Sequence, residues 1–316
     1  MASANRGFQG AVIRMFRAPE LRLRVLAAAL ECGGLMKRIT FTSVDPFPDE
    51  LFLPAAWIRL WFSTGDGREV QRAYTVASYS QERHTVDVSF YLHQTTGPAA
   101  SWALHVRAGA EIRASVFGSR AFRPLAEAHG VALLGDETAF PAVRAIAASL
   151  PETTTVRVIL TGTHDLSAFM PQRRGRDDRD DDGMDAGLSD TGATGSLVTG
   201  GHATDGRTAA SLAAGSLTTR YVPVAKAARA FERMVLRGAL ATEPQRGAES
   251  VDERHTEHDT GAARRLAGRG DDMRWLCWAA GESSMMRAVR SALRHHEDDA
   301  VASLQVQGYW SARRLF

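Results

Sequence analysis

The sequence is poor in cysteine and has no long uninterrupted apolar run. Cys32 and Cys277 are its two cysteines, whereas an iron–sulfur cluster or a structural zinc needs about four ligands. A redox role would therefore need a bound organic cofactor. Residues 21–30 are interrupted by Arg22 and Arg24, and no run reaches the ~20 apolar residues that cross a bilayer. We expect a cytoplasmic protein with reduced thiols and no membrane span.

The sequence also lacks an excess of either charge. Lys and Arg number 38 and Asp and Glu number 36, a formal net charge of +2, so nothing global indicates nucleic acid or an anionic membrane as a partner. Apolar residues make up 44% of the chain and charged residues 23%, which is ordinary for a globular protein of about two domains. We expect no metal site and no catalytic Ser-His-Asp arrangement.

Apolar residues alternate with polar ones between Met36 and Val116. Short alternating runs, broken by Gly, Pro and Asp, are typical of a small antiparallel barrel. The alternating positions are Ile39 and Phe41, Ile58, Leu60 and Phe62, Val86, Val88, Phe90 and Leu92, and Ile112, Ala114 and Val116. We therefore expect a β-barrel domain over about residues 10–125.

The pattern changes after Gly130, where continuous apolar runs replace the alternation. The candidate strands are 131–134, 156–160 and 275–280, and the candidate helices are 143–150, 224–240 and 284–293. Strands that alternate with helices predict a parallel sheet with helices on its faces. We therefore expect an α/β domain over about residues 126–316.

Two polar tracts interrupt this second domain. The first, near residues 171–219, begins with arginines and aspartates at 173–182 and continues with Gly, Ala, Ser and Thr; the second lies near residues 243–272. Both lack the apolar content to bury a core of their own. We expect flexible insertions without a catalytic part.

Arg72, Tyr74 and Thr75 form the first candidate site. We interpret them as a cation, an aromatic ring and a hydroxyl at alternate positions of a strand, projecting to one face. Such a face can hold a flavin, with Arg72 on phosphate, Tyr74 packed on the cofactor and Thr75 on a polar atom. The alternative is a surface strand without a ligand.

A second candidate follows the strand that ends near His93. A turn of small residues opens a helix near residues 99–105, and free backbone N–H groups at a helix start suit an anion such as a pyrophosphate. The residues assigned to this site are His93, Gly97, Pro98, Ala99, Ser101 and Trp102. The alternative is a plain Gly-Pro turn with Trp102 in the core.

Two strand-to-helix turns form a third candidate. Open α/β sheets bind ligands at the carboxyl ends of their strands, so two adjacent turns can bracket a nicotinamide. The first turn contains Gly135, Asp136, Glu137 and Thr138, and the second contains Gly281, Glu282 and Ser283. Neither carries GxGxxG, and helix caps without a ligand are the alternative.

Two adjacent aromatic residues, Tyr309 and Trp310, lie near the end of the sequence. They either pack into the second domain or cover a flavin ring, and simple packing is the favoured interpretation.

In order and approximate spacing these segments resemble the siderophore-interacting protein family, flavin reductases of the ferredoxin-reductase superfamily. The resemblance spans nearly the whole chain, from residues 36–40 to 308–310. It implies an FAD-binding barrel followed by a domain that binds NADPH or NADH. The implied reaction is hydride transfer to FAD and then single-electron transfer to a ferric siderophore, which releases ferrous iron.

The resemblance also implies roles for single residues. The RxYT segment at Arg72, Tyr74 and Thr75 is similar to the flavin contact, and the segment around Gly97 is similar to the phosphate-binding element. The turns at 135–138 and 281–283 resemble the nicotinamide-dinucleotide face. The family commonly has a further arginine where this chain has Ala77, which implies one cation fewer beside the flavin.

Four basic residues, Lys37, Arg38, Arg313 and Arg314, are candidates for attracting an acidic siderophore. Solvated surface charge is the alternative. Ser311 and Ala312 separate the aromatic pair from the last two arginines, whereas the family usually has a basic residue there at once.

Two other functions fit the same residues. One is a general flavin reductase that feeds another protein, and the other is a protein that binds siderophore or flavin without turnover. The sequence leaves open the choice between NADPH and NADH, the chelator and the oligomeric state, for which a monomer is favoured.

Overall fold

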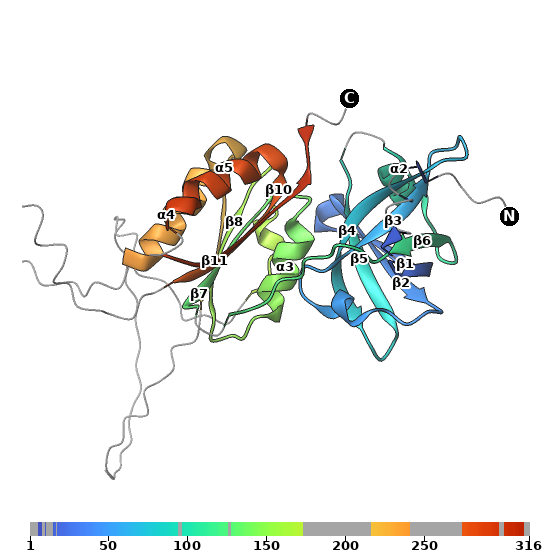
Figure 1. Ribbon diagram of the computed structural model, residues 1–316, viewed down its shortest axis with the longest axis horizontal. Helices are drawn as coiled ribbons and strands as arrows, with labels where there is room; N and C mark the ends of the chain where they lie inside the picture. Colours follow the sequence, from blue (N-terminus) through green and yellow to red (C-terminus); the bar gives the residue numbers. More distant parts are fainter. Residues whose placement is uncertain are drawn as a thin grey trace, which may run out of the picture.

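The computed structural model describes residues 6–7, 10, 15–16, 18–93, 97–125, 128–172, 216–240, 274–296 and 300–312. Within these residues the chain forms a closed antiparallel barrel and a parallel sheet, which lie side by side (Figure 1). The barrel strands end at Ser115, and the strands of the parallel sheet begin at Gly130.

The barrel has the strand order β1-β2-β5-β4-β3-β6. Its strands are β1 (Glu20–Glu31), β2 (Met36–Ser43), β3 (Trp57–Ser63), β4 (Glu69–Ser80), β5 (Thr85–Tyr91) and β6 (Glu111–Ser115). Successive side chains of a strand point to opposite faces, so inward residues such as Ile39, Phe41 and Val88 are fully buried. Each contributes about 1.5–3 kcal/mol relative to an exposed position. Helix α2 (Pro98–His105) packs on this core through Ala99 and Ala103.

The second unit is a five-stranded parallel sheet with the order β11-β10-β7-β8-β9. Its strands are β7 (Gly130–Gly135), β8 (Thr155–Leu160), β9 (Leu217–Tyr221), β10 (Trp275–Glu282) and β11 (Val301–Trp310). Its helices are α3 (Phe140–Ser149), α4 (Val224–Leu240) and α5 (Ser283–Leu293). Short 3-10 turns lie at Cys32–Gly34, Asp49–Phe52, Ser167–Phe169 and Arg294–His296.

The helices cover the two faces of the sheet unequally. Helices α4 and α5 pack on one face through Phe231, Val235 and Val289, and α3 packs on the other through Val143 and Ile146. Helix α3 also contacts strand β4, so it lies between the sheet and the barrel (Figure 1). The order of layers is therefore helices, sheet, helix and barrel.

The expected fold class, an antiparallel barrel followed by a parallel-sheet α/β unit, is confirmed. Three strands were not expected. In β1, Leu21 and Leu23 point inward between exposed arginines, an alternation that we had weighed only against a membrane span. Strand β9 begins at Leu217, inside the insertion predicted for 171–219. Edge strand β11 is half exposed, so its apolar pattern is weak.

Other differences are smaller. Leu92 was expected in a strand but follows the end of β5, and α3 begins at Phe140 rather than near residue 143. The predicted domain boundaries stay a prediction, and residues 173–215 and 243–272 of the predicted insertions lie outside the described residues. None of the helices within the described ranges is long and apolar enough to cross a membrane.

Candidate functional site

Strand β4 places Arg72, Tyr74 and Thr75 on two faces, so the expectation of one shared face was wrong. Tyr74 lies opposite Ile58, a fully buried residue of the barrel core, whereas Thr75 lies opposite Trp57. The physical reason is the two-residue period of a strand. Positions 72 and 74 share a face because they are two residues apart, and position 75 falls on the other face.

Arg72 and Tyr74 share a face of β4 but have different surroundings. The Tyr74 ring packs against Phe90 at 4.2 Å and Phe62 at 6.1 Å between ring centroids. Burial raises the pKa of Tyr74, and the charge of Arg72 acts in the opposite direction. The Arg72 side chain is exposed, and its guanidinium donates a hydrogen bond to the carbonyl of Gln71 at 2.9 Å. Arg72 is therefore accessible to an anion.

Helix α2 begins with an open first turn. Gly97 is its N-cap residue, with extended φ and ψ of −87° and 168°, and among the described residues no side chain caps this turn. A Cβ atom on Gly97 would meet nothing within 4 Å. The first N–H groups of a helix have no partner inside it, and Pro98 fits the first position because proline lacks this group. The turn is thus suited to a phosphate.

The remaining residues of this segment divide between core and surface. Ala99 is buried and Ser101 is exposed. Trp102 packs against the barrel core, edge-on to Phe62 at 5.6 Å and tilted against Phe90 at 6.0 Å between ring centroids. His93 is exposed and follows β5. Because Phe90 contacts both Tyr74 and Trp102, strand β4 and helix α2 meet around one aromatic cluster.

Asp136 links three segments that are distant in the sequence. Its Oδ1 accepts hydrogen bonds from the Thr138 N–H at 2.9 Å and the Ala139 N–H at 3.2 Å. Its Oδ2 accepts from the Glu282 N–H and from Trp310 Nε1, each at 2.8 Å. Only 4% of Asp136 is exposed. Burial raises its pKa, against the hydrogen bonds from Thr138, Trp310 and Ala139.

The second turn packs closely on the first. Gly281 has φ of +148°, and a Cβ atom there would lie 2.5 Å from Oδ2 of Asp136, so this position requires glycine. Glu282 caps helix α5, because its carboxylate accepts hydrogen bonds from the N–H groups of Ser284 at 2.6 Å and Met285 at 3.0 Å. Ser283 donates a hydrogen bond to the Trp310 carbonyl at 2.6 Å.

Glu137 points to the neighbouring strand instead. Its Oε1 accepts hydrogen bonds from the N–H groups of Thr163 at 2.5 Å and His164 at 2.8 Å, in the turn that follows β8. It is 7% exposed. A Cβ atom on Gly162 would lie 2.0 Å from Oε2 of this carboxylate, and Gly162 has φ of +131°. Glu137 therefore fixes the turn after β8.

The C-terminal aromatic pair divides between packing and exposure. Tyr309 packs against the core between the sheet and α3. Burial raises the pKa of Tyr309 to about 12, while the Thr75 hydroxyl beside it acts in the opposite direction. Trp310 is 38% exposed and is held by Asp136. Tyr309 thus lies between the sheet and strand β4, and Trp310 lies over the carboxyl edge of the sheet.

Two of the four basic candidates have protein partners. Lys37 donates a hydrogen bond to the Leu104 carbonyl at 2.9 Å, and Arg38 forms ion pairs with Glu31 at 2.9 Å and Asp87 at 3.6 Å. Both side chains thus have partners within the protein, so they are less available to bind an acidic ligand. Arg313 and Arg314 lie outside the described residues.

Three residues that the sequence analysis did not select lie at the same edge. The Tyr91 hydroxyl is 3.0 Å from Nδ1 of His164, and the Tyr221 hydroxyl donates to the Gly162 carbonyl at 2.7 Å. Burial raises the pKa of Tyr91 to about 12, and Glu137 acts in the same direction. The rule that ligands bind at strand ends applies equally to the turn after residues 156–160, so it could have identified His164.

The barrel residues fit an FAD diphosphate. Arg72 is an exposed cation, and the first turn of α2 offers N–H groups behind an open glycine. Both lie next to the aromatic cluster of Tyr74, Phe90 and Trp102. Cationic and backbone donors of this kind are what a pyrophosphate requires.

Two family profiles match the chain and together cover more than half of it. The siderophore-interacting FAD-binding domain matches residues 33–116, and the siderophore-interacting protein family matches residues 207–313. The first match covers β2 to β6 with α2, and the second covers β9 to β11 with α4 and α5.

Curated relatives match parts of the chain. The mycobactin import ATP-binding/permease protein IrtA of Mycolicibacterium thermoresistibile is 31% identical over 172 residues, 52% of this chain and 19% of that protein. The ferric vibriobactin reductase ViuB of Vibrio cholerae is 33% identical over 85 residues, 27% of this chain and 31% of that protein. The chain therefore spans about a fifth of the length of IrtA.

Solved structures share the fold over most of the chain. The siderophore-interacting protein from Acinetobacter baumannii has a TM-score of 0.56 at 18% identity, covering 93% of this chain and 91% of that one. SipS from Aeromonas hydrophila has a TM-score of 0.51 at 18% identity, covering 93% and 99%. With both family profiles and the fold in agreement, the chain belongs to the siderophore-interacting protein family.

Proposed function

We propose that this chain is a flavin-dependent reductase that passes electrons from NADH or NADPH through FAD to the ferric iron of a siderophore. The match of the FAD-binding domain family to the barrel carries the proposal, because it falls on Arg72 and the open turn of α2. A relative named as a ferric vibriobactin reductase supports the proposed substrate class.

The barrel residues have distinct proposed roles toward the flavin. Arg72 and the N–H groups at the start of α2 bind the diphosphate. Tyr74 and Trp102 belong to the aromatic cluster beside this diphosphate site. Thr75 faces the sheet beside Tyr309, where its hydroxyl is placed toward the junction of the two units. When bound, FAD accepts a hydride and releases its electrons one at a time.

The sheet residues have a proposed role toward the nicotinamide dinucleotide. Strand order places β7 next to both β8 and β10, so the direction of the chain reverses at β7. Open α/β sheets bind ligands outside the carboxyl ends of their strands at such a point. Asp136 and Glu282 lie at these ends, and Trp310 covers them. We assign the nicotinamide to this edge of the sheet, with Trp310 on the side toward the barrel.

The test is the visible spectrum of the purified chain reconstituted with FAD, followed without oxygen. We expect NADH or NADPH to bleach the flavin absorbance and a ferric siderophore to restore it, with ferrous iron appearing in a colour assay. Bleaching without restoration until a protein acceptor is added would favour the general flavin reductase. A bound flavin that no nicotinamide cofactor bleaches would favour the binding protein.

A paired substitution tests the flavin site. Arg72→Ala should raise the Kd for FAD about tenfold or more, because one charge-assisted contact with phosphate is lost. Arg83→Ala, an exposed arginine in the turn after the other end of β4, should leave it unchanged. Fluorescence titration of the apoprotein with FAD measures both, and equal Kd values for the two variants would remove Arg72 from the site.

A further inference from the structure

The carboxyl edge of the sheet is occupied by the protein's own carboxylates. Asp136 accepts hydrogen bonds from the N–H groups of the turn before α3, Glu282 from those at the start of α5, and Glu137 from those of the turn after β8. In many dinucleotide-binding folds such N–H groups hold phosphate. Here the same positions present negative charge to a ligand.

The turn after β8, residues 161–165, has the position that determines cofactor choice in folds of this kind. An acidic side chain near the end of the second strand hydrogen-bonds a ribose 2′-hydroxyl, whereas an arginine accommodates a 2′-phosphate. Strand β8 is the second strand of this sheet in chain order. Its turn ends in Asp165, an exposed carboxylate whose Oδ1 accepts a hydrogen bond from the Ser167 N–H at 2.9 Å.

Two carboxylates act on this turn together. Burial raises the pKa of Tyr221, and the charges of Glu137 and Asp165 raise it further, so both charges act at the Tyr221 hydroxyl above Gly162. The side-chain oxygen of Thr161, at the start of the turn, is buried and has no hydrogen-bond partner within the described part of the chain. The turn therefore combines the negative charges of Glu137 and Asp165 with the unpartnered hydroxyl of Thr161.

Within the described ranges, Asp165 forms no ion pair with a basic side chain. His164 lies 3.5 Å from Glu137 and beside the Tyr91 hydroxyl, so its ring already has partners in the protein. Arg220 precedes Tyr221 on β9 and projects to the opposite face of the sheet, since neighbouring residues of a strand alternate. A 2′-phosphate carries about −1.5 to −2 charges near pH 7 and would be repelled here.

We infer that this chain selects a nicotinamide dinucleotide without a 2′-phosphate, NADH rather than NADPH, and that Glu137 and Asp165 determine the selection. The inference rests on the part of the proposed function that binds the dinucleotide at this edge. It decides between NADH and NADPH as the electron donor, a choice that the sequence leaves open.

Binding of two nucleotides that differ only in the 2′-phosphate tests the inference. Isothermal titration of the full chain, with FAD bound, should give a Kd for 2′,5′-ADP about tenfold or more above that for 5′-AMP. The difference should shrink at high salt, because salt screens the repulsion between exposed charges. The same ratio should appear in kcat/KM for NADPH and NADH.

Charge-neutral variants test whether Asp165 and Glu137 cause the weaker binding of 2′,5′-ADP. Asp165→Asn keeps the acceptor for the Ser167 N–H, and Glu137→Gln keeps the acceptor for Thr163 and His164, so each removes charge and preserves the turn. Either variant should bring the two Kd values closer, and both together should bring them within about threefold. Asp66→Asn, an exposed carboxylate of the barrel, removes the same charge elsewhere and should leave the ratio unchanged.

Outcomes for the inference and for the proposed function are separate. The inference would be overturned if 2′,5′-ADP bound as tightly as 5′-AMP or more tightly, or if neither nucleotide bound. It would also be overturned if the ratio of the two Kd values were the same in the folded Asp165→Asn variant as in the unchanged protein. Iron reduction is tested independently by reducing the flavin with dithionite and adding ferric siderophore. A chain that prefers 5′-AMP but leaves ferric iron unreduced would support the inference and overturn the reductase.

Discussion

Among the described glycines, Gly162 has the least room for a Cβ atom. A Cβ atom there would lie 2.0 Å from the Glu137 carboxylate, at a φ of +131° that L side chains rarely adopt. Gly162→Ala would push this carboxylate away from the N–H groups of Thr163 and His164. We expect the free energy of unfolding to fall by about 2 kcal/mol, through backbone strain and lost hydrogen bonds. Urea denaturation measures it.

Gly97 provides the matched control at this scale. Its φ is −87° and a Cβ atom would meet nothing within 4 Å, so Gly97→Ala should lower the stability of the apoprotein by no more than about 1 kcal/mol, the cost of replacing a glycine N-cap by alanine. Equal losses for the two variants would show that Gly162 is not held by the contact with Glu137.

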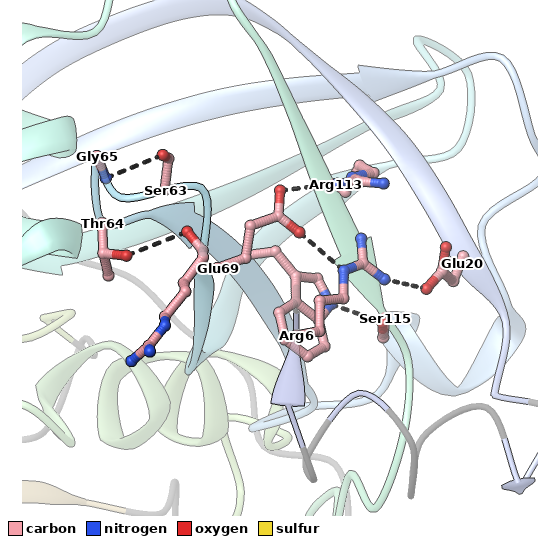
Figure 2. A network of polar contacts seen from close by, with 10 residues as sticks. Arg6, Glu20, Ser63, Thr64, Gly65, Glu69, Arg113 and Ser115 are labelled. Carbon is pink, nitrogen blue, oxygen red and sulfur yellow. Dashed lines mark hydrogen bonds and ion pairs between the residues drawn. The ribbon is translucent and has the colours of Figure 1, made fainter. Parts of the chain in front are cut away.

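At the scale of elements, an ion-pair network ties the residue Arg6 to three barrel strands. The Arg6 guanidinium lies 4.3 Å from the Trp61 ring, pairs with Glu20 and donates to Glu69 at 2.8 Å. Arg113 donates to the other oxygen of Glu69, also at 2.8 Å (Figure 2). Glu69 is thus shared by two arginines, which joins β4 to β6 and to Arg6.

This network makes stability depend on pH through Glu69. Burial acts to raise its pKa, but the hydrogen bonds and charges of Arg6 and Arg113 outweigh burial and hold the pKa below the usual glutamate value. A carboxyl with a lowered pKa adds stability above its unfolded pKa and loses it as the pH falls through the folded pKa. Glu69→Gln should therefore cost on the order of 1 kcal/mol near pH 7 and less near pH 3.

Urea denaturation of both proteins at the two pH values measures this dependence. Glu82→Gln, an exposed glutamate in the turn between β4 and β5, is the control and should leave stability nearly unchanged at either pH. A loss for Glu69→Gln that is the same at both pH values would show that the ion pairs do not contribute.

At the scale of the whole molecule, the barrel and the sheet share one apolar core. Cys32, Met36 and Ala55 of the barrel unit pack in the same cluster as Phe140 of α3 and Leu133 of β7. Met36 is 1% exposed, on the outer side of β2. The two units are thus joined by burial as well as by the contacts of Tyr91 and Tyr309.

Met36→Ala should therefore loosen both units. We expect a loss of about 2–5 kcal/mol from the cavity, and faster hydrogen exchange in peptides of α3 and β7 as well as β2. Ile39→Ala is the matched control, because Ile39 lies on the same strand, is fully buried and belongs to the barrel core alone. If α3 and β7 respond equally to both variants, the shared cluster is not what joins the units.

The candidate site was predictable where a turn follows a recognisable strand. The turns at Asp136 and Glu282 lie at adjacent strand ends as expected, because parallel strands bring their carboxyl ends to one edge. Their side chains could not be assigned from sequence, since Asp136 reaches Trp310 across 174 residues. The face of Thr75, by contrast, could have been predicted from sequence, because the two-residue period of a strand places it on the face opposite to Tyr74.

By itself the sequence determined the two kinds of β-structure and the position of the segments proposed to bind the cofactors. Alternation and continuous apolar runs are local patterns, and they follow from which side chains must avoid water. Only the tertiary structure decided that Glu137 reaches the turn after β8, that Tyr309 meets Thr75, and that the barrel and sheet share a core. Such contacts depend on strand order and on how the two units pack, which no local pattern encodes.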